Sequence, residues 1–183
     1  MARIDFHSNV ADKLLYCCRL SRKILASADS TGQHRTIVIV GNPKELQDLD
    51  ALMWGFSKTD FLPHAWLDHD AAQETPIVFV SDINQLKDSS IPHCDVLIYL
   101  KNEAPPQLDT LLARFPRWVE VVITQEDERL AGRERYKLYR QMGHELYHFD
   151  QARSSAIKVR VYRLLLLLRH SSMLFQQYLN API

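Results

Sequence analysis

The chain has 183 residues, 46% of them hydrophobic and 24% charged, which is typical of one globular domain with a core of its own. Its 22 lysines and arginines equal its 22 aspartates and glutamates, and this balance argues against a protein held on DNA mainly by its overall field. Nowhere do about 18 apolar residues follow one another, so no segment is expected to span a membrane.

The first residues and the cysteines indicate a cytoplasmic protein. The N-terminal residues lack the basic-then-apolar pattern of a signal peptide. The cysteines are odd in number, and Cys17 and Cys18 are adjacent, which makes them poor candidates for a disulfide. We expect reduced thiols, with Cys94 inside a buried strand.

Charge is unevenly distributed along the chain. Residues 1–150 carry 17 lysines and arginines against 22 acids, whereas residues 151–183 carry five basic residues and no acid. This asymmetry predicts an α/β domain over residues 1–150 and an atypical basic, leucine-rich extension over residues 151–183. The extension has three interpretations: it folds back on the domain, it mediates self-association or membrane-surface contact, or it has no selected role.

The hydrophobic pattern predicts strands and helices in alternation. Residues 3–8 alternate like a short strand, and the apolar spacing over residues 9–28 predicts a helix capped by Ser8 or Asn9. A loop is expected around Pro63. Continuous β-branched runs predict buried strands at residues 36–40, 76–80, 95–100 and 119–123. Further helices are predicted at residues 43–54, 107–115 and 125–142.

Strands rich in valine and isoleucine that alternate with helices favour a Rossmann-like, doubly wound α/β fold. Its sheet is expected to be mostly parallel, with helices on both faces. Such a fold invites a nucleotide site, but the turn Gly41-Asn42-Pro43-Lys44 matches neither G-x-G-x-x-G nor the P-loop. Pro43 also removes an amide donor. We therefore expect no nucleotide-binding loop and no cofactor.

Residues 144–148 contain a possible catalytic motif. His144, Glu145 and His148 match the H-E-x-x-H pattern of zinc hydrolases. That pattern requires a helix, and the preceding Gly143 looks like the cap that ends a helix instead. A third ligand would have to come from an acid very close in sequence or from the extension. We interpret the pattern as a chance match at the end of a helix, and expect no catalytic residue and no metal. A zinc hydrolase is the alternative.

A row of cations follows one face of the helix predicted at residues 125–142. At 100° per residue, one narrow stripe contains an aromatic and four basic side chains, Arg129, Arg133, Tyr136, Lys137 and Arg140. Apolar residues on the opposite side, such as Leu138 and Tyr139, would dock on the core. The stripe is predicted to face water as a receptor for an anion, either a phosphate backbone or the acidic tail of a partner protein. The alternative is an ordinary solvated basic face.

Large apolar residues gather a second time after the helix predicted at residues 43–54. Trp54, Phe56 and Phe61 flank the polar residues 57–59. Core packing is the default interpretation for each of them alone. An exposed aromatic patch, of the kind that anchors protein interfaces, is an equal alternative for the cluster.

These features together resemble a known family. The segments Leu49-Asp50-x-x-x-Trp54 and Phe61-Leu62-Pro63-His64, the buried strand at residues 95–100 and the motif Arg133-Glu134-Arg135-Tyr136-Lys137-x-Tyr139-Arg140 occur in its order and spacing. The family is the chi subunit of bacterial DNA polymerase III holoenzyme. The resemblance covers roughly residues 1–150, so the extension departs from the family pattern.

The resemblance implies a non-catalytic accessory subunit that binds two proteins. Its contact with the psi subunit, which links it to the clamp loader, would use Trp54, Phe61, Pro63 and His64. Its contact with the acidic, Phe-terminated C-terminal tail of single-stranded DNA-binding protein would use Arg129, Arg133, Tyr136 and Lys137, with Val122 on the neighbouring strand. Arg129 stands where the family pattern can hold lysine. DNA contact would be at most indirect, with direct single-stranded nucleic-acid binding through the same stripe as the alternative.

Overall fold

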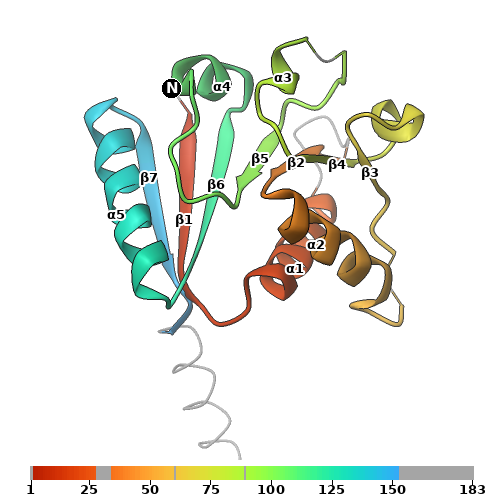
Figure 1. Cartoon of the computed structure of the whole chain (residues 1–183), viewed down its shortest axis with the longest axis horizontal. Helices are drawn as coiled ribbons and strands as arrows, with labels where there is room; N and C mark the ends of the chain where they lie inside the picture. The colour runs from red at the N-terminus through yellow and green to blue at the C-terminus, as the bar shows by residue number, and fades with distance from the viewer. Residues whose placement is uncertain (1, 28–33, 60, 89, 153–183) are drawn as a thin grey trace, which may run out of the picture. The chain divides into compact units, whose positions relative to one another are not determined.

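The structure is a computed structural model, and it describes residues 2–27, 34–59, 61–88 and 90–152. The chain up to Phe149 forms one compact unit, shown in Figure 1. Apart from its first two residues, the extension at 151–183 lies outside the described residues, so its role and the predicted domain boundary stay predictions. Within the described ranges no helix is both long and apolar enough to cross a bilayer.

Among the described residues, seven strands form a single sheet in the order β3-β4-β2-β5-β6-β1-β7. The strands are β1 (Arg3–Val10), β2 (Ile37–Val40), β3 (His64–Trp66), β4 (Ile77–Val80), β5 (Val96–Tyr99), β6 (Arg117–Ile123) and β7 (Glu145–Asp150). The pairs β1–β6, β2–β4, β2–β5, β3–β4 and β5–β6 run parallel. Every residue of β2, β4 and β5 is buried, as continuous β-branched runs predict for parallel strands covered on both faces.

Helices cover both faces of this sheet. They are α1 (Lys13–Leu25), α2 (Pro43–Gly55), α3 (Gln85–Asp88), α4 (Leu108–Arg114) and α5 (Glu126–Gln141), with a 3-10 turn, η1, at Asp70–Gln73. Because strand side chains alternate between faces, Val38 and Val40 pack in a core with α4 and α5. Ile37 and Ile39 pack in a second core with α1 and α2. The predicted doubly wound α/β fold is confirmed.

The first helix begins later than the sequence pattern suggested. Val10 pairs with Ile123, so β1 runs past the predicted end of the strand. The predicted caps, Ser8 and Asn9, are therefore wrong. Asp12 is the cap, because its Oδ1 accepts a hydrogen bond of 2.9 Å from the backbone N–H of Leu15.

Two short edge strands and one cysteine also differ from prediction. β3 occupies the segment that was expected to be a loop around Pro63, and β7 follows α5 where only the end of a helix was expected. Both lie at the ends of the sheet, where a strand needs no continuous apolar run. Cys94 is exposed in the loop before β5 and is not part of a buried strand.

Candidate functional site

Helix α5 is fixed on the sheet by a buried carboxylate. Glu120 of β6 is fully buried and accepts hydrogen bonds from Arg135 Nε at 3.0 Å and from the Tyr139 hydroxyl at 2.6 Å. Trp118 Nε1 donates a third at 3.0 Å. Arg135 and Tyr139 are one turn apart, so they fix the rotation of the helix about its axis. A buried pair of this kind is costly to break, because the remaining charge is left without a partner.

The protonation states of this network are stable. Burial and the charge of Glu120 raise the pKa of Tyr139 well above its ordinary value. Burial alone would lower the pKa of Arg135, but the charge and hydrogen bonds of Glu120 outweigh it, and the net direction is upward. Arg135 also donates to the carbonyl oxygen of Asn102. Both donors therefore keep their protons at physiological pH. The burial of Arg135 was not anticipated from the sequence.

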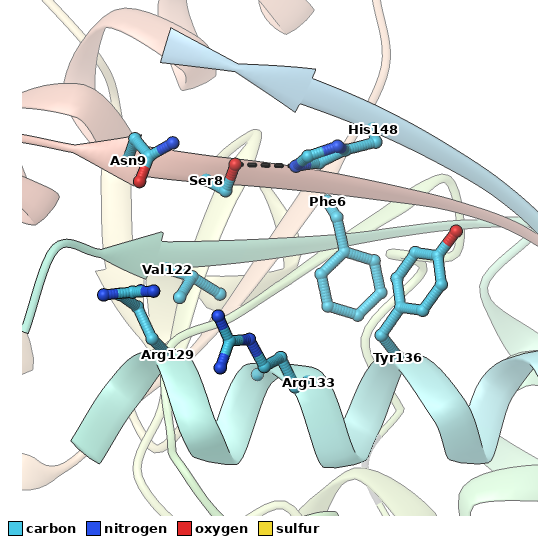
Figure 2. Close-up of a pocket in the computed structure, with 9 residues that line it drawn as sticks. Phe6, Ser8, Asn9, Val122, Arg129, Arg133, Tyr136 and His148 are labelled. Carbon is cyan, nitrogen blue, oxygen red and sulfur yellow. Dashed lines mark hydrogen bonds between the residues drawn. The ribbon is translucent and has the colours of Figure 1, made fainter. Parts of the chain in front are cut away.

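With this rotation, α5 forms one wall of a pocket at the end of the sheet (Figure 2). The cavity has a volume of about 360 Å³. Residues from four elements line it: Phe6, Ser8 and Asn9 of β1, Val122 of β6, Arg129, Gly132, Arg133 and Tyr136 of α5, and His148 of β7. Four of the five residues predicted for the acidic tail thus come together: Arg129, Arg133, Tyr136 and Val122.

The inner part of the pocket is apolar. The rings of Phe6 and Tyr136 pack edge to face with centroids 5.1 Å apart, and the side chain of Val122 is 5% exposed. Tyr136 is therefore half-buried. The helical stripe had predicted that it would face water. Gly132 lets α5 approach β6 closely, since a Cβ there would lie 3.0 Å from Val122 Cγ2. Sequence reasoning gave no role to Phe6 or Gly132.

The basic side chains differ in their partners. Arg129 forms an ion pair with Glu126 at 2.6 Å, and Lys137 forms one with Glu134 at 2.7 Å. Both pairs are exposed, so each contributes only about 0–1 kcal/mol to stability. Arg133 has no ion-pair partner within the described part of the chain. Lys137 does not line the cavity, so it is the predicted residue that the structure leaves outside the pocket.

The wall opposite α5 is polar. Ser8 Oγ lies 2.6 Å from His148 Nε2, and both side chains line the cavity (Figure 2). Neither residue was predicted as part of the site. Their position depends on β7 lying next to β1, and the sequence pattern did not reveal that strand.

Two of the residues predicted for the psi subunit, Trp54 and Phe61, form an exposed aromatic patch at the end of α2, whereas the side chain of His64 is only 1% exposed. Trp54 and Phe61 are 63% and 59% exposed, and their ring centroids lie 5.2 Å apart. The ring of His64 meets Trp54 at 5.3 Å, and its Nε2 lies 3.1 Å from Asp50 Oδ1. Pro63 is half-buried between Leu62 and His64. Core packing is therefore wrong for Trp54 and Phe61.

One member of the aromatic cluster does belong to the core. Phe56 is partly buried and packs against the core on the α1 and α2 side of the sheet. Two residues that are close in sequence thus point in different directions: Phe56 faces the core and Trp54 faces solvent.

The H-E-x-x-H segment has no zinc-site geometry. His144 precedes β7 and the rest of the segment lies along this strand instead of on a helix, and a rise of about 3.3 Å per residue keeps two residues four apart from sharing one metal ion. His144 Nδ1 accepts from the backbone N–H of Ala2 at 3.3 Å, while His148 meets Ser8. Among the described residues no group of three or more potential ligands surrounds a common point. The interpretation as the end of a helix is also wrong.

A lysine lies in the crevice at the carboxyl ends of β2 and β5, where doubly wound folds hold nucleotides. Lys13 Nζ forms ion pairs with Glu128 at 2.8 Å and Glu45 at 3.4 Å, and donates to the Leu100 carbonyl at 3.1 Å. Its side chain is 9% exposed. The position at which related folds hold a nucleotide is thus occupied by the ammonium group of Lys13 and its two carboxylate partners.

The fold and the pocket define a doubly wound α/β domain with a groove beside α5 that is lined by two arginines and an apolar inner part. The family of the DNA polymerase III chi subunit, HolC, matches residues 1–147. The chain belongs to this family, whose members are accessory subunits of a replicative DNA polymerase. It is similar to DNA polymerase III subunit chi of Pseudomonas aeruginosa, with 27% identity over 150 residues, which covers 80% of this chain and 94% of the relative.

Proposed function

We propose that this chain is a non-catalytic bridging subunit with two protein-binding surfaces. The pocket beside α5 binds the acidic, Phe-terminated C-terminal tail of single-stranded DNA-binding protein. The aromatic patch around Trp54 and Phe61 binds the psi subunit, which links the chain to the clamp loader. The chain contacts DNA at most indirectly, and it acts in the cytoplasm.

The observation that carries this proposal is the pairing of an unpartnered cation with an apolar cup. Among the described residues Arg133 has no ion-pair partner, and it lines the same cavity as Phe6, Val122 and Tyr136. A guanidinium group binds a carboxylate through two parallel hydrogen bonds, and the cup accepts an aromatic ring. A volume of about 360 Å³ suits a single side chain with a terminal carboxylate.

The remaining cations support a ligand that carries several negative charges. Arg129 lines the pocket, and its partner Glu126 is exposed, so an incoming carboxylate can take the place of Glu126 at small cost. Lys137 lies one turn beyond Arg133 and adds a charge outside the cavity. An acidic tail that runs along α5 therefore meets Arg129, Arg133 and Lys137, which follow one another at intervals of one helical turn.

The aromatic patch supports a second partner of a different kind. Trp54 and Phe61 expose large apolar rings at the end of one helix, and such rings dominate the binding energy of protein interfaces. Contacts of His64 with Leu62 and Asp50 hold the patch in one arrangement. The patch and the pocket share no residue, so both partners can be bound together.

The test is a titration of a fluorescent acidic peptide that ends in phenylalanine, followed by anisotropy. Arg133→Ala is expected to weaken binding about tenfold or more, because a hydrogen-bonded charge is worth roughly 1.5–3 kcal/mol. Arg140→Ala is the matched control, since Arg140 is exposed on the same helix and lies outside the pocket. It should lower the affinity much less.

Two results would contradict the proposal. One is equal peptide affinity in the unmodified chain and in Arg133→Ala, with both folded. The other is tighter binding of a single-stranded oligonucleotide than of the peptide across a salt series, which would assign the cations to phosphate. Peptide affinity itself should fall as salt increases, because exposed charges are screened over about 10 Å at 0.1 M.

A further inference from the structure

The pocket wall opposite α5 has no part in the interactions proposed so far. Ser8 and His148 form it, joined by the 2.6 Å contact between Oγ and Nε2, and they face the same cavity as Arg129 and Arg133 (Figure 2). We infer that Ser8 and His148 are a second carboxylate-binding wall, and that His148 makes peptide binding stronger in mildly acidic solution. This inference rests on the proposed function.

The contact between the two side chains depends on the charge of the imidazole ring. In a neutral ring one nitrogen donates and the other accepts. When Nε2 carries no hydrogen, it accepts a hydrogen bond from the Ser8 hydroxyl. In a protonated ring both nitrogens donate, and Nε2 then donates to Ser8 Oγ. The hydroxyl hydrogen of Ser8 is released and can donate to a ligand. Protonation therefore adds a positive charge and an O–H donor to this wall.

The groups around His148 favour an anion in the cavity. Titratable, charged or hydroxyl groups come from three elements: Arg129, Arg133 and Tyr136 on α5, Ser8 on β1, and Asp150 two residues further along β7. Among the described residues none with a carboxylate lines the cavity itself. A carboxylate in the cavity is attracted by a protonated ring as well as by the two guanidinium groups, so ligand and proton support each other.

The direction of the pH effect follows from this coupling. Histidine side chains ordinarily change charge between about pH 5 and 8. The peptide binds more tightly when the imidazole ring is protonated, so binding should be tighter in mildly acidic than in mildly basic solution. His7, the neighbour of Ser8 on β1, does not contribute: burial lowers its pKa to about 4, so its ring stays neutral above about pH 5.5.

The experiment measures peptide affinity by anisotropy at about pH 5.5 and about pH 8 and compares the ratio of the two dissociation constants. In the unmodified chain we expect binding about two- to five-fold tighter at the lower pH, the range for exposed charge pairs. In His148→Gln the ratio should fall close to one, because glutamine forms hydrogen bonds without titrating. His69→Gln, which replaces an exposed histidine in front of η1, is the matched control and should keep the ratio.

The source of the carboxylate is identified with two peptides, one with a free C-terminus and the other with a C-terminal amide. If the pH effect disappears with the amide, His148 meets the terminal carboxylate. If the effect remains, His148 meets aspartate side chains of the tail. Both results support a carboxylate at this wall, and they place the tail in opposite directions along the pocket.

The outcomes separate this inference from the function on which it rests. Equal ratios in the unmodified chain and in His148→Gln would overturn it, provided that Arg133→Ala still weakens binding. If Arg133→Ala has no effect at either pH, the proposed function itself falls. An NMR measurement on the unmodified chain avoids any folding defect: at the lower pH the peptide should move the ring-proton signals of His148 and leave those of His69 in place. Unmoved His148 signals would also overturn the inference.

Discussion

The pocket beside α5 and the patch around Trp54 differ in the chemical character of their side chains. The pocket sets two guanidinium groups beside an apolar cup, and its wall depends on a carboxylate buried under the helix. The patch presents two aromatic rings to solvent at the end of a helix. Binding at the pocket should therefore respond to salt, pH and nearby carboxylates, whereas binding at the patch should follow the apolar area covered. The two contacts can accordingly be broken one at a time.

The largest expected effect comes from removing the support of the pocket. Arg135→Met leaves Glu120 buried without its charge partner, and we expect a loss of about 3–5 kcal/mol in the free energy of unfolding, measured in urea. Peptide binding should weaken as α5 loses its fixed rotation. Adding Glu120→Gln should restore part of the stability, because the amide oxygen still accepts from Trp118 and Tyr139. A loss below about 1 kcal/mol would show that the pair does not hold the helix.

A smaller effect is expected on the other surface alone. Trp54→Ala should weaken binding of the psi subunit by about 2–4 kcal/mol, measured by calorimetry, because exposed tryptophans at interface centres carry much of the binding energy. Peptide binding at the pocket should not change. Leu130→Ala is the matched control, since Leu130 is an exposed apolar residue of α5 that belongs to neither surface. Equal losses in both variants would remove the patch from the interface.

The smallest effect is an expected increase in peptide affinity at the pocket. Glu126→Gln removes the carboxylate that pairs with Arg129, so the acidic peptide should bind about two- to five-fold more tightly in an anisotropy titration. Binding of the psi subunit should stay the same, because the patch has no contact with Glu126. Weaker peptide binding in this variant would mean that Glu126 holds Arg129 in its binding position.

The sequence predicted the central part of this fold for a physical reason. β2, β4 and β5 are buried on both faces, so they need continuous runs of valine and isoleucine, which are visible without a structure. The edge strands β3 and β7 carry half-buried and exposed residues and lack that signal. The cap at Asp12 was missed because two other good capping residues, Ser8 and Asn9, precede it. Both belong to β1.

The site was predicted in the same uneven way. The cations of α5 could be found from helical spacing, and four of the five proposed tail-binding residues do meet at one cavity. Helical spacing places Arg135 one turn from Tyr139 on the core-facing side, but its burial was missed because the carboxylate that compensates its charge, Glu120, lies on another element, 15 residues away. Ser8 and His148 are 140 residues apart, and only the pairing of two strands at the sheet end brings them together. Helical periodicity carries no information about such distant neighbours.

The close seating of α5 on β6 has a further consequence for how a tail is exchanged. Gly132 against Val122 and the two anchors on Glu120 leave the helix one arrangement, so the receptor is preorganised. Ordering is then required mainly of the incoming peptide, whose own lost freedom limits its affinity. On the proposed function, capture of a tail would need no rearrangement of the domain, and differences in affinity between tails would appear mainly in their release rates. A change of tail at this rigid cleft would leave a partner at α2 in place.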